Sequence, residues 1–172
     1  MKTSLVLTVI ADDQPGIIEA VSSTLKKHSG NWTKSSMSSL AGQFAGILLA
    51  SIPDDRIEAC CVDLQALESR GLKIIVRTCN DEVTAKEVDE FSMQLVGNDR
   101  PGIVHEITTV LARNDVSVKE FETSVESASM SSGSIFKASA HLLVPEGSDI
   151  HTLEDELENL ANDLMVDIKF KK

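Results

Sequence analysis

The sequence contains no tyrosine and one tryptophan, and it is poor in basic residues. Lysine and arginine together number 16 against 27 aspartates and glutamates, which gives a formal net charge of -11 at pH 7. A chain this acidic repels a phosphate backbone, and with 3% aromatic residues it offers few rings on which bases could stack. Direct binding to nucleic acid is therefore not expected.

Cysteines and long apolar runs are also scarce. The three cysteines, Cys60, Cys61 and Cys79, form no C-x-x-C pair, so reduced thiols in the cytoplasm are expected. No run approaches the roughly 18 apolar residues that a membrane span needs. The apolar start of the chain lacks a small-residue cleavage site and ends in Asp12 and Asp13. We expect a first strand of a cytoplasmic protein that does not contact a membrane.

Motifs for catalysis and for metal binding are missing as well. The four histidines form no H-x-x-x-H pair, and the sequence has no phosphate-binding loop and no G-x-S-x-G motif. We therefore expect a protein that is not an enzyme, with no catalytic residues, no metal site and no cofactor.

The sequence does contain an internal repeat. The segment DDQPGI at 12–17 returns as NDRPGI at 98–103, an offset of 86 residues. In both copies an alternating apolar run precedes this segment and an apolar pattern with helical spacing follows it. Two further β-like runs, a second helical pattern and a final β-like run complete each copy. The offset grows to 92 between Phe44 and Phe136, and the serine-rich stretch 126–134 is predicted to absorb the difference as a loop.

The order β-α-β-β-α-β in each copy predicts an α+β fold made of two tandem ferredoxin-like domains. Each domain is expected to be a four-stranded antiparallel sheet with two helices on one face. The predicted boundaries are 1–80 for the first domain, 81–89 for a polar linker and 90–172 for the second domain. Whether two chains associate into a homodimer stays open.

The repeated turn has the features of a site for a zwitterion. Gly16 and Gly102 carry no Cβ, and the first turn of the helix that each segment opens offers free backbone NH groups at the positive end of the helix dipole. Such a terminus suits a carboxylate. The side chains that could accept from an ammonium group beside it are Asp12, Asp13, Asn98 and Asp99.

A purely structural interpretation fits the same residues. Pro15 and Pro101 fix φ near the helical value and are expected in the first helical turn, and Asp13 could cap its own helix. A duplication would copy such a turn together with the rest of the fold. On the residues alone, ligand binding and helix capping stay equally open.

The segment NDRPGIVHEITTVLARNDVSVKEFE, at 98–122, resembles the opening of an ACT domain, a regulatory module that binds amino acids, and 12–33 resembles it with weaker agreement. Two such modules in tandem resemble the glycine cleavage system transcriptional repressor family. The resemblance implies a regulator that senses glycine and represses transcription by contacting a DNA-binding regulatory protein. The ligand-binding residues it implies are Asp12, Asp13, Gly16, Ile17, Asn31, Asn98, Asp99, Gly102 and Ile103.

Other interpretations stay open. The chain could sense a different amino acid and control a metabolic enzyme. The ferredoxin-like order also occurs in acylphosphatases, which use an arginine in an anion-binding loop, and Arg100 occupies such a loop while Gln14 replaces it in the first copy. The serine-rich stretch 34–40 could instead be a surface that binds only protein. Ser117 stands at the position of Asn31, so the two sites need not be equivalent.

Overall fold

Both copies of the predicted fold are formed in the computed structural model, which describes residues 1–79, 88–127 and 133–172. The chain divides into two compact units, Met1–Val83 and Thr84–Lys172. Each unit has its own sheet and its own hydrophobic core.

The two units have the same order of elements. The first contains β1 (Lys2–Asp12), α1 (Ile17–Lys27), β2 (Asn31–Leu40), β3 (Gln43–Pro53), α2 (Ile57–Ala66) and β4 (Lys73–Cys79), with short 3₁₀ helices at Asp54–Arg56 and Leu67–Arg70. The second contains β5 (Val88–Asn98), α3 (Ile103–Arg113), β6 (Ser117–Ser127), β7 (Ser134–Pro145), α4 (Ile150–Leu164) and β8 (Val166–Lys171).

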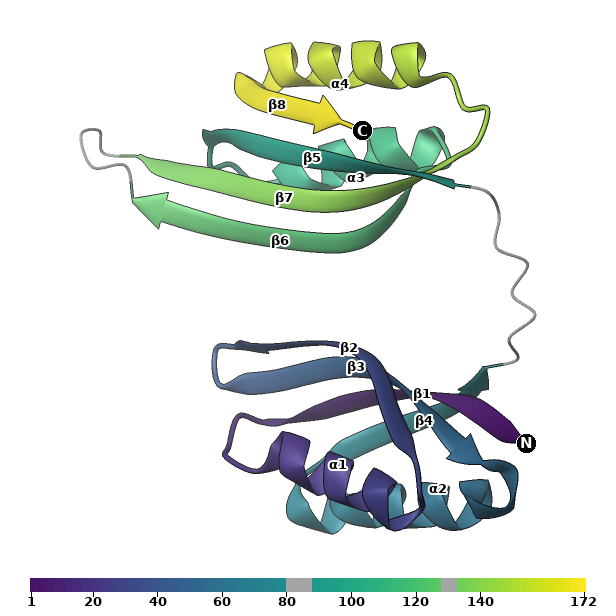
Figure 1. Ribbon diagram of the computed structural model, residues 1–172. Helices are drawn as coiled ribbons and strands as arrows, with labels where there is room; N and C mark the ends of the chain where they lie inside the picture. The colour runs from purple at the N-terminus through teal and green to yellow at the C-terminus, as the bar shows by residue number, and fades with distance from the viewer. Residues whose placement is uncertain (80–87, 128–132) are drawn as a thin grey trace. The chain divides into compact units, whose positions relative to one another are not determined.

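Each sheet has four strands, in the orders β2-β3-β1-β4 and β6-β7-β5-β8. Every pairing among these strands is antiparallel. The two helices of each unit lie on one face of its sheet (Figure 1). The predicted fold, two tandem ferredoxin-like domains, is confirmed.

The predicted linker, 81–89, overlaps the second unit. β5 begins at Val88, which pairs with Pro145, and residues 80–87 lie outside the described part of the chain. The sequence did not reveal this start because Val88 is followed by two acidic residues, Asp89 and Glu90, which are as typical of a linker as of the end of a strand. The predicted loop 126–134 lies mostly outside the described residues, and its ends belong to β6 and β7.

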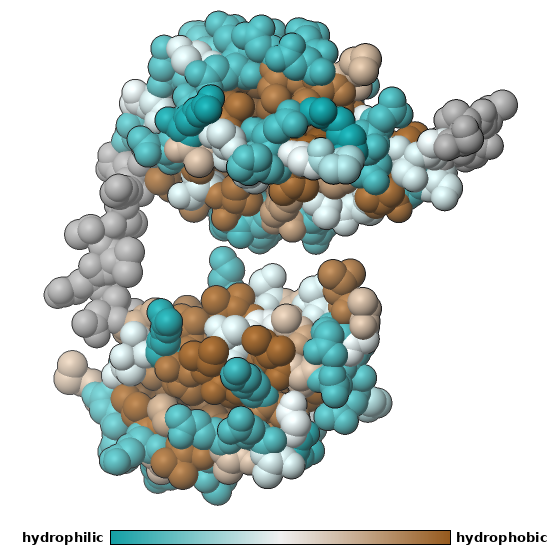
Figure 2. Space-filling model, turned by 180° about the vertical axis from the view of Figure 1, so that it is seen from behind, coloured by the Kyte–Doolittle hydropathy of each residue, from teal (hydrophilic) through white to brown (hydrophobic). Residues whose placement is uncertain are grey.

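Buried and exposed side chains alternate along the strands, so each sheet has one buried face. In β1 the side chains of Leu5, Leu7 and Val9 are fully buried beneath the helices. The opposite face of the first sheet carries exposed isoleucines, Ile47 and Ile75, on either side of Thr8. Hydrophobic side chains are thus visible at the surface as well as in the core (Figure 2).

The helices bury a narrower stripe than the sequence pattern predicted. In α1 the side chains of Ile17, Val21 and Leu25 are buried, as expected, but Ile18 is 50% exposed. Val104 occupies the equivalent position in α3 and is also exposed. Adjacent helical residues point about 100° apart, so the second apolar residue of each pair turns away from the sheet.

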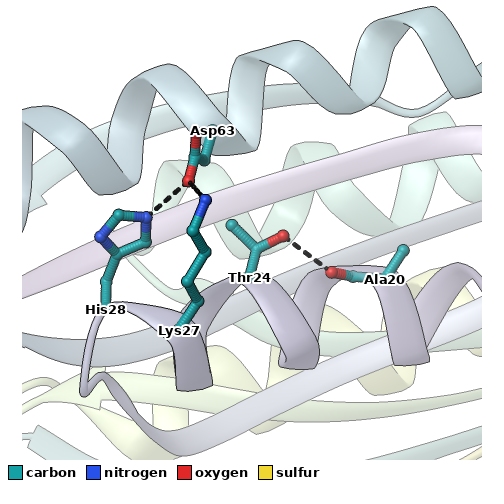
Figure 3. A network of polar contacts seen from close by, with 5 residues as sticks. All are labelled: Ala20, Thr24, Lys27, His28 and Asp63. Carbon is teal, nitrogen blue, oxygen red and sulfur yellow. Dashed lines mark hydrogen bonds and ion pairs between the residues drawn. The ribbon is translucent and has the colours of Figure 1, made fainter.

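A polar contact joins the two helices of the first unit (Figure 3). Lys27 Nζ and His28 Nε2 lie 2.7 Å and 2.8 Å from the same oxygen, Asp63 Oδ2 on α2. His28 is 6% exposed, and among the described residues it is the polar side chain that is buried. The hydrogen bond from Lys27, and after it that from His28, holds the pKa of Asp63 below its ordinary value.

Asp63→Asn should therefore destabilise the first unit at neutral pH. Because the pKa of Asp63 is lowered on folding, its charge stabilises the protein fully above the ordinary carboxyl pKa of about 4, and this effect is lost as the pH falls through the lower folded-state value. The denaturation midpoints of wild type and variant should differ at neutral pH and converge in acid. Asp55→Asn, at a side chain 80% exposed, is the control. A difference that persists unchanged in acid would contradict this role of the charge.

Candidate functional site

The repeated turn leads into each unit's first helix through a left-handed glycine. Gly16 has φ 94° and Gly102 has φ 92°, and each is the N-cap of its helix. Within the described residues no side chain caps either helix. The capping interpretation of Asp13 is therefore wrong, because its side chain does not bind the NH groups of α1.

The prolines lie outside the helices. Both helices begin one residue after the glycine, at Ile17 and Ile103, so Pro15 and Pro101 precede the N-cap instead of occupying the first turn. The physical reason is that the chain reverses at a positive φ, which only the glycine between proline and helix adopts without strain. The prediction that these prolines start the helix is wrong.

The space around the first glycine is open. A Cβ added to Gly16 would have no atom within 4 Å. The Ala20 NH donates to the Gly16 carbonyl over 2.9 Å and so makes the first backbone bond of α1. The NH groups that precede it in the first turn have no acceptor within a helix, and the helix dipole favours a negative group there. This is the geometry of a carboxylate site.

The two acidic side chains of the first turn contact the β2–β3 hairpin. Ser39 Oγ donates to Asp13 Oδ2 over 2.5 Å, and Gln43 Nε2 donates to Asp12 Oδ1 over 2.6 Å. The Asp13 NH donates to the Gly42 carbonyl over 2.9 Å. These three bonds fix the loop beside the helix. A carboxylate offers about four acceptor positions, so both side chains keep the capacity to accept from a ligand ammonium.

The second copy keeps only part of this arrangement within the described residues. The Asp99 NH donates to the hairpin, to a carbonyl oxygen 2.8 Å away. By strand register, Val125 stands in the place of Ser39 and Ile135 in the place of Gln43. Neither of these side chains can donate a hydrogen bond, so the two side-chain contacts of the first copy have no equivalent at these positions.

An ion pair replaces these contacts at the second turn. Arg100 Nη2 lies 2.7 Å from Glu106 Oε2 in the first part of α3. A Cβ on Gly102 would lie 3.6 Å from Glu106 Oε1, so the carboxylate lies over the glycine. The residues at the equivalent positions of the first copy are Gln14, whose amide is 3.5 Å from the Arg70 carbonyl, and the buried Ala20.

The structure limits how three of the predicted residues could take part in a site. Ile17 and Ile103 are 4% and 3% exposed, so their side chains belong to the core and only their backbone can face a ligand. Asn31 is exposed but pairs with Ser51, whereas the turn adjoins Gln43 at the other end of β3. Within its own unit Asn31 does not reach the turn, and it could contribute only to a turn of another module.

Ser39, Gln43 and Glu106 contact residues of the two turns, and the sequence did not indicate these contacts. Ser39 lies in a run of serines without periodicity, and Gln43 follows a turn. For Glu106 the signal in the sequence was its alignment with Ala20 by the repeat, which adds to the difference between Gln14 and Arg100.

A shallow depression of about 330 Å³ lies elsewhere, on the second sheet. It is lined by strand residues of β5, β6 and β7, among them Gln94, Glu122, Lys137 and Ser139, and it includes none of the predicted site residues. A regular sheet surface offers no oriented set of free NH groups, because its backbone donors are paired along the strands. The turns remain the better candidates for a ligand site.

Metal ligands and membrane spans were searched over residues 1–79, 88–127 and 133–172. In these ranges no three His, Cys, Asp or Glu side chains come together in a way that could hold a metal ion. No helix in the same ranges is long and apolar enough to cross a membrane.

The βαββαβ fold occurs twice, and in each copy a glycine is the N-cap of the first helix. These features define a two-module protein of the ferredoxin-like α+β class. The model of the ACT domain matches residues 3–76 and again residues 92–171. The chain therefore belongs to the ACT domain family. No curated protein gives a significant match.

Two solved structures cover nearly the whole chain. An unknown protein from Galdieria sulphuraria is 26% identical, with a TM-score of 0.89 over 99% of this chain and 98% of that one. A candidate glycine cleavage system transcriptional repressor is 18% identical, with a TM-score of 0.68 over 99% of this chain and 97% of that one. At 18% identity, the similarity to the second structure shows a shared fold and nothing more.

Proposed function

We propose that this chain is a non-enzymatic regulatory protein that senses a small amino acid. The observation that carries the proposal is the first turn, where an uncapped helix N-terminus, open space at Gly16 and the fixed carboxylate of Asp13 lie side by side. ACT domains are regulatory modules that bind amino acids, and both copies of this fold belong to that family.

The ligand's two charges match the two parts of the turn. Its carboxylate would accept from the first NH groups of α1, and its ammonium would donate to Asp13 or Asp12. Glycine has about five heavy atoms, which at a ceiling of about 1.5 kcal/mol each limits binding to about 7.5 kcal/mol. This corresponds to a Kd no tighter than a few micromolar, a range suited to a metabolite present at micromolar to millimolar concentration.

Glycine is the ligand we propose, and repression of glycine cleavage system transcription is the proposed role. The likeness to a candidate repressor of that system supports this choice. The net charge of -11 favours action through a DNA-binding regulatory protein over direct contact with DNA. The acylphosphatase alternative is weakened because Arg100, which would have to hold the phosphate, is paired with Glu106.

A panel of the twenty amino acids, followed by thermal unfolding, tests the proposal. Glycine at about a hundredfold excess over its Kd should stabilise the folded state by about 2.7 kcal/mol and raise the melting temperature by several degrees. A larger shift with another amino acid would replace glycine as the ligand. An unchanged melting temperature with all twenty would remove the sensing function.

A further inference from the structure

We propose that the Arg100–Glu106 ion pair closes the second turn to anionic ligands, so that each chain binds one amino acid, at the first turn. The inference rests on the proposed function and adds to it a difference between two turns that the repeat makes alike. Glu106 would be the residue that determines this difference.

The position of Glu106 carries the argument. It is the fourth residue of α3, and its Oε1 lies 3.6 Å from where a Cβ on Gly102 would be. The protein's own carboxylate therefore lies where a ligand carboxylate would approach the helix terminus. A ligand carboxylate at this distance would be repelled by the Glu106 carboxylate. The free NH groups at the start of α3 would also be shared between two anions.

Arg100 holds the carboxylate in this place. Its Nη2 lies 2.7 Å from Glu106 Oε2, and the bond spans the turn on both sides of Gly102. The side chains are 41% and 38% exposed, so solvent weakens the pair and a ligand in large excess could displace it. The ion pair therefore weakens ligand binding at the second turn without preventing it. We expect the affinity there to be lower than at the first turn by at least about tenfold.

The first turn lacks this arrangement. Ala20 stands in the place of Glu106 and is 3% exposed, while Gln14 stands in the place of Arg100. α1 does have an acidic residue in its first turn, Glu19, but no atom lies within 4 Å of a Cβ built on Gly16. The two turns thus share their backbone and differ in whether a carboxylate of the chain covers the glycine.

Glycine titration of the ¹⁵N-labelled full chain, read residue by residue, tests the proposal. In the wild type the amide signals of Ile17 and Ile18 should shift with glycine, and those of Ile103 and Val104 should shift only at concentrations at least about tenfold higher. In Glu106→Ala, which gives the second copy the residue of the first, both sets should shift over the same range. Glu106→Gln tests the loss of charge at nearly constant size. Glu122→Ala, which removes an exposed acid from β6, is the matched control and should behave as the wild type.

Each outcome decides between the two proposals. Equal shifts at both turns of the wild type would overturn the closure and leave amino acid sensing intact. A second turn that stays silent in both Glu106 variants would overturn the closure too. Shifts at the second turn only, and only in the variants, would support the closure but remove the first turn from the proposed function. A chain that shows no shift in any form would end both proposals.

Discussion

Gly16→Asp should abolish the response to glycine, with an affinity loss on the order of a hundredfold. The new carboxylate would stand at the N-cap of α1, beside the NH groups that we assign to the ligand carboxylate. Two like charges about 4 Å apart repel by about 1 kcal/mol in water and about 4 kcal/mol near a protein surface. Since 1.4 kcal/mol corresponds to a factor of ten, the expected loss falls between about fivefold and several hundredfold.

The matched control is Gly16→Asn. Asparagine has nearly the shape of aspartate and, like it, tolerates a positive φ better than other side chains do. The φ of 94° at this position strains both variants, so the comparison isolates the charge. Calorimetric titration with glycine should show binding to the asparagine variant and none to the aspartate variant. Equal loss in both would mean that the backbone of the turn, and not its electrostatics, had been disrupted.

Leu95→Ala should lower the free energy of unfolding of the second unit by about 2 to 5 kcal/mol. Leu95 lies in the central strand β5, is 0% exposed, and contributes to the core beneath α3 and α4. Removing its side chain leaves a cavity in a close-packed interior and forfeits the burial of apolar surface. Denaturant titration, followed through the amide signals of the second unit, measures the change.

Val96→Ala provides the comparison at the next position. Val96 points to the other face of the same sheet and is 43% exposed, so its truncation should cost less than about 1 kcal/mol. The pair of variants tests whether the sheet buries one face only. A cost at Val96 as large as that at Leu95 would show that another surface covers this face in solution.

The fold was predictable because the sequence contains the same pattern of strands and helices twice. A single apolar run or a single Pro-Gly turn has many interpretations, but the same order of runs at a constant offset has few. The position of the core followed from alternation in β1 and from the stripe that includes Val21 and Leu25, and the structure confirms both.

The edge strand β2 shows where the pattern failed. Trp32 and Met37 both pack against the core although they are five residues apart, a spacing that puts two residues of a regular strand on opposite faces. A β-bulge between Trp32 and Lys34 restores them to one face. β6 has an irregularity at the equivalent place, between Val118 and Glu120. One inserted residue reverses the alternation, so the sequence pattern alone could not assign the faces of these strands.

The site was less predictable than the fold because its contacts join residues far apart in the chain. The bond between Asp13 and Ser39 requires the strand register, and the pair of Arg100 with Glu106 requires the side-chain conformations of a turn and a helix. Local sequence predicted that a helix follows each Pro-Gly turn, but it put the prolines inside the first helical turn instead of before the N-cap. It could not tell that one carboxylate is held by the hairpin and that another covers a glycine.

The bonds between turn and hairpin also bear on where the two copies differ in length. Three bonds, to Ser39, Gly42 and Gln43, tie the first hairpin to its turn, so a residue inserted between them would misalign all three. The described part of the second copy retains the backbone bond alone, and its hairpin is the one that has grown. Among the described residues, the longer hairpin is thus the one with fewer bonds to its turn, so a change in spacing between Asp99 and Ser134 would disturb one such bond where the first copy has three.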